Sequence, residues 1–228
     1  PQPLVAMGRF EHEACAWEPR YGHIYMTEDR PDGNLYRFKP AVYGDLARGG
    51  QLQAVGLLPL SDTALACRWI DVENPDPEND EIRHIAQSRG AATFTRPEGL
   101  RLDDSGIYFS TTAGGKQGLG EIFRIQPTGP DGGTIELVFE SGSKGPIQPD
   151  ALVRAPGGIL LVCEDNDRDH DHVLGLTPDG RWFSLARGRK VGWTGITFSP
   201  DGKVLFLNQQ YVGRTLVVTG DWTALAEI

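Results

Sequence analysis

The chain has 228 residues, of which 39% are hydrophobic and 23% are charged, and this composition is typical of a single globular domain at the upper end of the usual size range. With 22 basic and 31 acidic residues the net charge is −9, so nucleic acids and anionic membrane surfaces are unfavourable partners. The longest apolar run, residues 159–163, is far below the roughly 20 residues of a membrane span, and no signal sequence opens the chain, so we expect a soluble protein.

The number and spacing of the cysteines and glycines limit the possible fold classes. Three cysteines at wide, irregular spacing, Cys15, Cys67 and Cys163, predict neither a disulfide framework nor a zinc site of the Cys-x-x-Cys kind. Most of the 29 glycines recur singly between short runs of branched and aromatic residues. Glycines at turns between short strands are typical of an all-β protein.

One pattern occurs four times along the chain, starting at residues 12, 97, 149 and 193. Each copy consists of a short strand, a tight turn that ends in glycine, and a second strand followed by a polar residue. The turn glycines are Gly22, Gly106, Gly158 and Gly202. The last two spacings between copies, 52 and 44 residues, suit the blades of a β-propeller.

Further strands are predicted at residues 34–38, 121–125, 173–176 and 216–219, where outward and inward residues alternate. Three or four short strands per unit, without a helical period, predict an all-β fold, namely a β-propeller with four recognisable blade units. A β-sandwich made of the same hairpins is the alternative.

The domain organisation follows from the repeat. We expect residues 1–228 to form a single β-propeller domain or the C-terminal part of one, because an open ring would leave two blade faces exposed. A compact four-bladed ring is the competing possibility. Residues 61–93 are an acidic, proline-bearing insertion in the first unit, expected on one rim, with a short helix within residues 78–88.

The repeat places acidic residues at equivalent positions. Some open the first strand of their units and others close the second strand, and in a propeller these strand ends converge on the channel mouth. Crowded carboxylates repel one another unless a cation neutralises them, and oxygen ligands suit hard cations such as calcium. The predicted metal ligands are Glu13, Glu28, Glu98, Asp150, Glu164 and Asp165.

Other chemical motifs are weaker. Residues 165–172 resemble a calcium loop, but His170 and Leu176 stand where an EF-hand needs Gly and Glu, so a solvated turn is expected. The glycine-rich residues 114–116 could contact an anion through backbone amides or form a mobile hairpin loop. Cys163 could be a thiolate ligand for a soft metal or a small buried hydrophobe.

Five segments, in order, resemble the later part of the bacterial PhoX family of alkaline phosphatases and its uncharacterised relatives. They read MGRFEHEA, YMTEDRPDGNLYRF, FTRPEGLRLDDSGIYFSTT, IQPDALVRAPGGILLVCEDN and FSPDGKVLFLNQQYVGRTLVVTGDW, and cover nearly the whole chain apart from residues 61–93. The resemblance implies a propeller, periplasmic or secreted by the twin-arginine route. It also implies a hydrolase that cleaves small phosphorylated substrates with calcium and iron ions.

Matched to the family's motifs, the expected catalytic residues are Glu13, Glu98, Glu164 and Arg96, with Arg30 as a second candidate to contact phosphate. The family's upstream cysteine-containing motif has no counterpart here, and Gly192 stands where relatives usually carry Glu, so calcium is expected, with iron as an addition. Two alternatives remain open. One is a calcium-dependent lactonase-like propeller that uses Asn208, and the other is a non-catalytic calcium-binding propeller.

Overall fold

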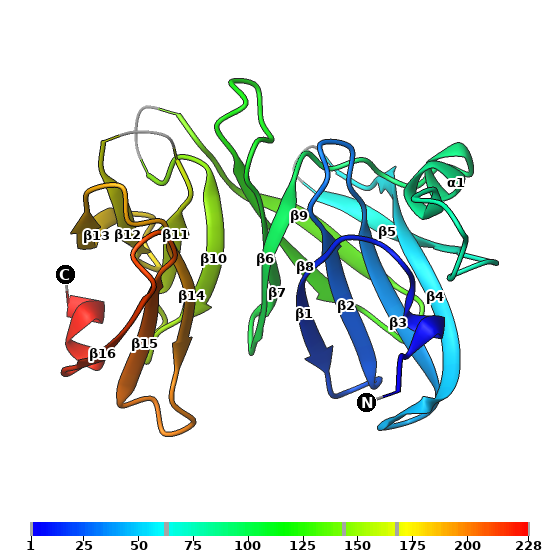
Figure 1. Ribbon diagram of the computed structural model, residues 1–228, viewed down its shortest axis with the longest axis horizontal. Coiled ribbons are helices and arrows are strands. Elements are labelled where there is room, and N and C mark those ends of the chain that lie inside the picture. The colour runs from blue at the N-terminus through cyan, green and yellow to red at the C-terminus, as the bar shows by residue number, and fades with distance from the viewer. Residues whose placement is uncertain (1, 62–63, 143–144, 167–168, 228) are drawn as a thin grey trace. The chain divides into compact units, whose positions relative to one another are not determined.

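A computed structural model describes residues 2–61, 64–142, 145–166 and 169–227, and most of them lie in antiparallel strands (Figure 1). The chain divides into two compact units, Pro1–Phe109 with Phe123–Val138, and Ser110–Ile122 with Phe139–Ile228. Within the described part of the chain, no helix has the length and apolar character needed to span a membrane. The all-β prediction is confirmed.

The first unit is built on a nine-stranded sheet in the order β1-β2-β3-β4-β5-β9-β8-β7-β6. Its strands, three of which extend past the limits of the unit, are β1 (His12–Glu18), β2 (His23–Glu28), β3 (Leu35–Val42), β4 (Asp45–Pro59), β5 (Ala64–Asp71), β6 (Pro97–Asp103), β7 (Gly106–Thr111), β8 (Glu121–Pro127) and β9 (Gly133–Glu140). β1–β4 and β6–β9 are two four-stranded groups, and β5 joins them because it pairs with both β4 and β9.

The second unit contains two smaller sheets in simple antiparallel order. The four-stranded sheet consists of β10 (Pro149–Arg154), β11 (Leu160–Glu164), β12 (Asp171–Leu176) and β13 (Trp182–Gly188), and the three-stranded sheet of β14 (Trp193–Phe198), β15 (Val204–Gln209) and β16 (Arg214–Thr219). The four hairpins that the repeat predicts are therefore β1–β2, β6–β7, β10–β11 and β14–β15. At their turns Gly22 and Gly106 have φ of 75° and 140°, which few other residues adopt.

The side chains of each strand point alternately to its two faces, and the apolar ones form the hydrophobic cores. In β2 the consecutive residues Tyr25 and Met26 enter different hydrophobic clusters, because successive side chains of a strand point to opposite faces. In the second unit, Val173 and Trp193 belong to one cluster that both of its sheets share. Short 3-10 turns at Val5–Met7 and Thr223–Glu227 complete the described elements.

The acidic insertion contains both a strand and a helix. β5 lies within residues 61–93, and so does α1 (Ile82–Ser88), which confirms the helix predicted there. Ile82 and Ala86, one turn apart, pack on the cluster that contains Tyr36 and Phe38. The rim position of the insertion stays a prediction.

His23, the first residue of β2, gives the fold a pH dependence. It is 4% exposed, and burial, followed by the charges of Arg37 and Lys39, lowers its pKa from 6.5 to about 4. Between these two values the unfolded chain holds a proton on His23 that the folded protein does not, so this residue destabilises the fold as the pH falls. The expected loss is about 1 kcal/mol per pH unit in this window.

Replacing His23 with Gln should therefore flatten the pH dependence of unfolding between about pH 6.5 and pH 4. The measurement is the free energy of unfolding in urea across this range, for the wild type and H23Q. His84→Gln is the matched control, because the His84 side chain is 54% exposed. Equal slopes for wild type and H23Q would show that His23 does not supply the effect.

Candidate metal centre

Two of the predicted ligands, Glu13 and Glu98, are brought together in the first unit. Each is the second residue of its strand, in β1 and β6 respectively, and their carboxylates offer oxygens within 4.8 Å of each other. Thr27 of β2 fixes this arrangement, since its hydroxyl accepts from the Ala14 amide at 3.0 Å and donates to the Glu98 carbonyl at 2.5 Å. The packing of β1, β2 and β6 at this place therefore fixes the positions of Glu13 and Glu98 relative to each other.

Two oppositely charged side chains, Asp29 and Arg96, lie near this pair of carboxylates. The Arg96 guanidinium donates through Nε and Nη2 to the two oxygens of Asp29 at 2.9 and 3.0 Å, and it also forms an ion pair with Glu98. The backbone of Arg96 has φ of 53°, and its amide donates to the Arg30 carbonyl at 2.9 Å. Arg96 is thereby held to the turn that follows β2.

The pKa of Glu13 is raised, first by burial and then by nearby negative charge. Desolvation by the surrounding protein raises its pKa most, the carboxylate of Asp29 raises it further, and Arg96 opposes both effects. Because a raised pKa disfavours the charged form, a cation at this place would be stabilising.

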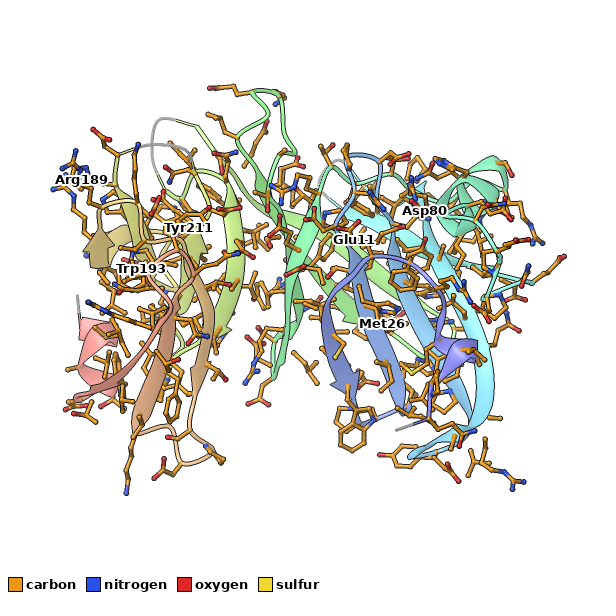
Figure 2. The ribbon with its side chains drawn as sticks, viewed as in Figure 1. Glu11, Met26, Asp80, Arg189, Trp193 and Tyr211 are labelled. Atoms are coloured by element: carbon orange, nitrogen blue, oxygen red, sulfur yellow. The ribbon has the colours of Figure 1, made fainter. Side chains whose placement is uncertain are left out.

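Arg30 has carboxylate partners of its own. Its Nε lies 2.9 Å from Glu11 and its Nη2 lies 3.1 Å from Asp80, both of which are labelled in Figure 2. These contacts tie the turn after β2 to the segments before β1 and α1.

Glu28, the last residue of β2, is fully buried. One carboxylate oxygen, Oε2, accepts from the Asn34 amide at 3.2 Å and from the Tyr36 hydroxyl at 2.9 Å. The other oxygen, Oε1, has no hydrogen-bond donor among the described residues and lies 3.6 Å from Nη1 of Arg83. Burial raises the pKa of Glu28. An orphaned oxygen of this kind suits a hard cation, although Arg83 competes for it.

In the second unit, Asp150 is the second residue of β10, as Glu13 and Glu98 are in β1 and β6. It is 8% exposed, and its carbonyl accepts from the Ser110 hydroxyl at 2.7 Å. Asp165 follows β11, and the Tyr211 hydroxyl, labelled in Figure 2, donates to it at 3.4 Å.

Glu164, at the end of β11, is held by donors of the protein. Its Oε1 accepts from the Ile147 amide at 2.9 Å, and its Oε2 accepts from the side chains of His172 and Asn166 at 2.9 and 3.2 Å. The His172 amide also donates to Oε2, at 3.0 Å. A metal ion at Glu164 would have to replace some of these donors.

The surroundings of Cys163 and of the glycine-rich loop show how these two weaker motifs are used. Cys163 is fully buried in a hydrophobic cluster and burial raises its pKa, so it is a small core residue rather than a thiolate ligand. In the glycine-rich loop, the Lys116 amide donates to Glu140 at 2.7 Å, so this amide faces a carboxylate.

The solvated turn predicted for residues 165–172 is wrong for Asp171, which is 1% exposed. Its Oδ2 accepts from the amides of Val191 and Gly192 at 2.8 and 3.1 Å, so it closes the loop before β14. Asp167 and Arg168, in the same predicted turn, lie outside the described residues.

Sequence reasoning missed Asp29 and Thr27. A signal for Asp29 exists, because Glu28-Asp29 and Glu164-Asp165 are both acidic pairs at the end of a second strand. Thr27 gives no such signal.

Comparison with known proteins decides the family. The sequence profile of the family described as alkaline phosphatase PhoX matches residues 1–213. The chain belongs to the PhoX family. Among solved structures, Pseudomonas fluorescens PhoX in complex with vanadate, a transition-state analogue, is similar with a TM-score of 0.68 and 20% sequence identity, and the match covers 90% of this chain and 49% of that one. The chain thus spans about half the length of that PhoX structure.

The likeness to PhoX confirms the β-propeller, and the β-sandwich alternative is not supported. A Lactobacillus plantarum protein (TM-score 0.45, 13% identity, 90% of this chain and 54% of that one) and the periplasmic gluconolactonase of Pseudomonas aeruginosa (TM-score 0.43, 13% identity, 91% and 65%) are too dissimilar to inform the function. No curated protein matches the chain.

Proposed function

We propose that this PhoX-family chain belongs to a metal-dependent phosphomonoester hydrolase of the alkaline phosphatase type, acting on small phosphorylated substrates. The observation that carries the proposal is the carboxylate pair Glu13 and Glu98 with the Arg96 guanidinium beside it. Family membership supports it, as does the vanadate complex of P. fluorescens PhoX, because transition-state analogues bind the geometry that an enzyme stabilises.

The donor set fits a hard cation. Glu13 and Glu98 are proposed as metal ligands, and Asp150 is added because it holds the same position on its strand. Glu28 is a further candidate through Oε1, which accepts no hydrogen bond from the described residues. Glu164 and Asp165 stay predictions from the repeat. Carboxylate oxygens favour calcium, and iron is the second candidate.

Each residue has a proposed task. A bound cation would neutralise charge on the phosphoryl oxygens, which makes the phosphorus more open to attack by water. Arg96 is proposed to bind a phosphoryl oxygen as well as to orient Glu98, and Arg30 lies on the turn that Arg96 contacts. Asp29 positions Arg96 through its two hydrogen bonds. A periplasmic or secreted location is part of the proposal.

Hydrolysis of p-nitrophenyl phosphate by the full protein tests the proposal. We expect activity with calcium, loss of activity after exhaustive chelation, and recovery when calcium is restored. A lactone such as gluconolactone is the comparison substrate and should not be hydrolysed. Phosphatase activity that survives chelation would refute the metal dependence, and lactone hydrolysis without phosphatase activity would refute the substrate class.

A further inference from the structure

The second unit contains a pocket of about 330 Å³ beside β12 and β13. This volume lies at the lower end of the range of about 300–1,000 Å³ found for small-molecule sites. The lining residues used in the argument are Ile147, Asn166, His172, Leu174, Trp182 and Ser184, all of which belong to the second unit.

One section of the pocket wall is apolar and aromatic. Leu174 of β12 and Trp182 of β13 supply it, and they lie in adjacent antiparallel strands. Phe139 packs edge-on against the Trp182 indole, with the ring centroids 4.8 Å apart. Because this contact restrains the indole, the wall offers an ordered aromatic surface for a planar guest.

The adjoining section of the wall is polar, and Glu164 organises it. Its carboxylate is 4% exposed and bonds to three lining residues, namely Ile147, Asn166 and His172, over distances of 2.9 to 3.2 Å. The bond at Nδ1 of His172 fixes the orientation of the imidazole, whose Nε2 lies on the opposite edge of the ring. A buried group that locks several lining residues is a feature of preorganised binding sites.

We propose that this pocket binds a planar heteroaromatic ring such as a nucleobase. The aromatic wall stacks on the ring face, and the imidazole of His172 and the Ser184 hydroxyl are hydrogen-bonding groups for the ring edge. Neither lysine nor arginine occurs among the described lining residues. Glu164 acts here as a positioning residue. This role goes beyond phosphate hydrolysis and requires no metal ion at Glu164.

The test is isothermal titration calorimetry of the full protein with adenosine, which carries no phosphate, in the presence of a chelator. We expect saturable binding of adenosine and none of ribose. Trp182→Leu and His172→Gln should each weaken the binding about tenfold or more, since stacking on an aromatic side chain contributes strongly to base binding. Trp182→Phe, which keeps a ring, should retain most of the affinity.

Matched controls lie in the other unit. Trp17→Leu and His84→Gln alter side chains that are 52% and 54% exposed, and both variants should bind adenosine as the wild type does. Three results would overturn the proposal: no saturable heat with adenosine, equal binding of ribose, or unchanged affinity in His172→Gln. If Trp182→Leu does not fold, His172→Gln and Trp182→Phe decide. Because no hydrolysis is measured, the outcome is independent of the proposed phosphatase activity.

Discussion

Calcium should raise the melting temperature of the wild type, and Glu98→Gln should abolish most of that rise. At a calcium concentration of 100 times the dissociation constant, binding stabilises a protein by about 2.7 kcal/mol. Gln removes one of the two negative charges that Glu13 and Glu98 bring within 4.8 Å, and it places an amide nitrogen where a carboxylate oxygen stood. Thermal unfolding with and without calcium measures the effect, and phosphatase activity should fall in parallel.

Glu73→Gln is the matched control for this experiment. The Glu73 side chain is 79% exposed and pairs only with Arg89 in the contacts described for it, so its variant should show the wild-type calcium shift. Melting without calcium separates lost metal binding from lost packing, because Glu98 also pairs with Arg96. A full calcium shift in Glu98→Gln would remove this residue from the metal centre.

Arg37→Met should lower the free energy of unfolding by about 2 kcal/mol or more, because a buried acceptor left without its donor costs roughly 1–3 kcal/mol. The Arg37 side chain is 1% exposed. Its Nε donates to Gln53 at 2.8 Å, its Nη1 donates to the Pro130 carbonyl at 3.0 Å, and the guanidinium lies 4.1 Å from the Trp69 ring centroid. Methionine fills similar space but leaves the acceptors without their donor.

Urea denaturation followed by circular dichroism measures this loss. Arg101→Met is the control, because Arg101 is exposed, and surface changes of this kind usually stay within about 0.5 kcal/mol. Asp131→Asn should also have a small effect, since the Asp131 side chain is 70% exposed. A loss in Arg37→Met no larger than that in Arg101→Met would show that the network around Arg37 contributes little.

The hairpins of the fold could be predicted from the sequence because their signals are local. A turn glycine such as Gly106 and the alternating residues around it lie within about ten positions, and the repeat then fixes the register of Glu13 and Glu98. The same register places Glu28 and Glu164 at the ends of second strands, as the structure shows. The register alone does not show which ligand these carboxylates bind.

The contacts around the acids could not be predicted, because they join distant parts of the chain. Arg96 and Asp29 are 67 positions apart, and the composition of neither segment predicts their two hydrogen bonds. Asp171 lies in an acidic run that looks solvated, yet its partners are amides 20 and 21 positions later. Such pairings depend on tertiary structure, which local patterns do not encode.

The strand β5 determines which repeats of this protein can be separated from one another. Repeat proteins are commonly shortened or extended by whole repeats, since each repeat contacts its neighbours mainly through side chains. Here Ala64–Ala66 pair with Thr134–Glu136 through the backbone, so the first two repeats share a continuous hydrogen-bonded seam. Any recombination or truncation of this chain that respects its architecture has to keep those two repeats together.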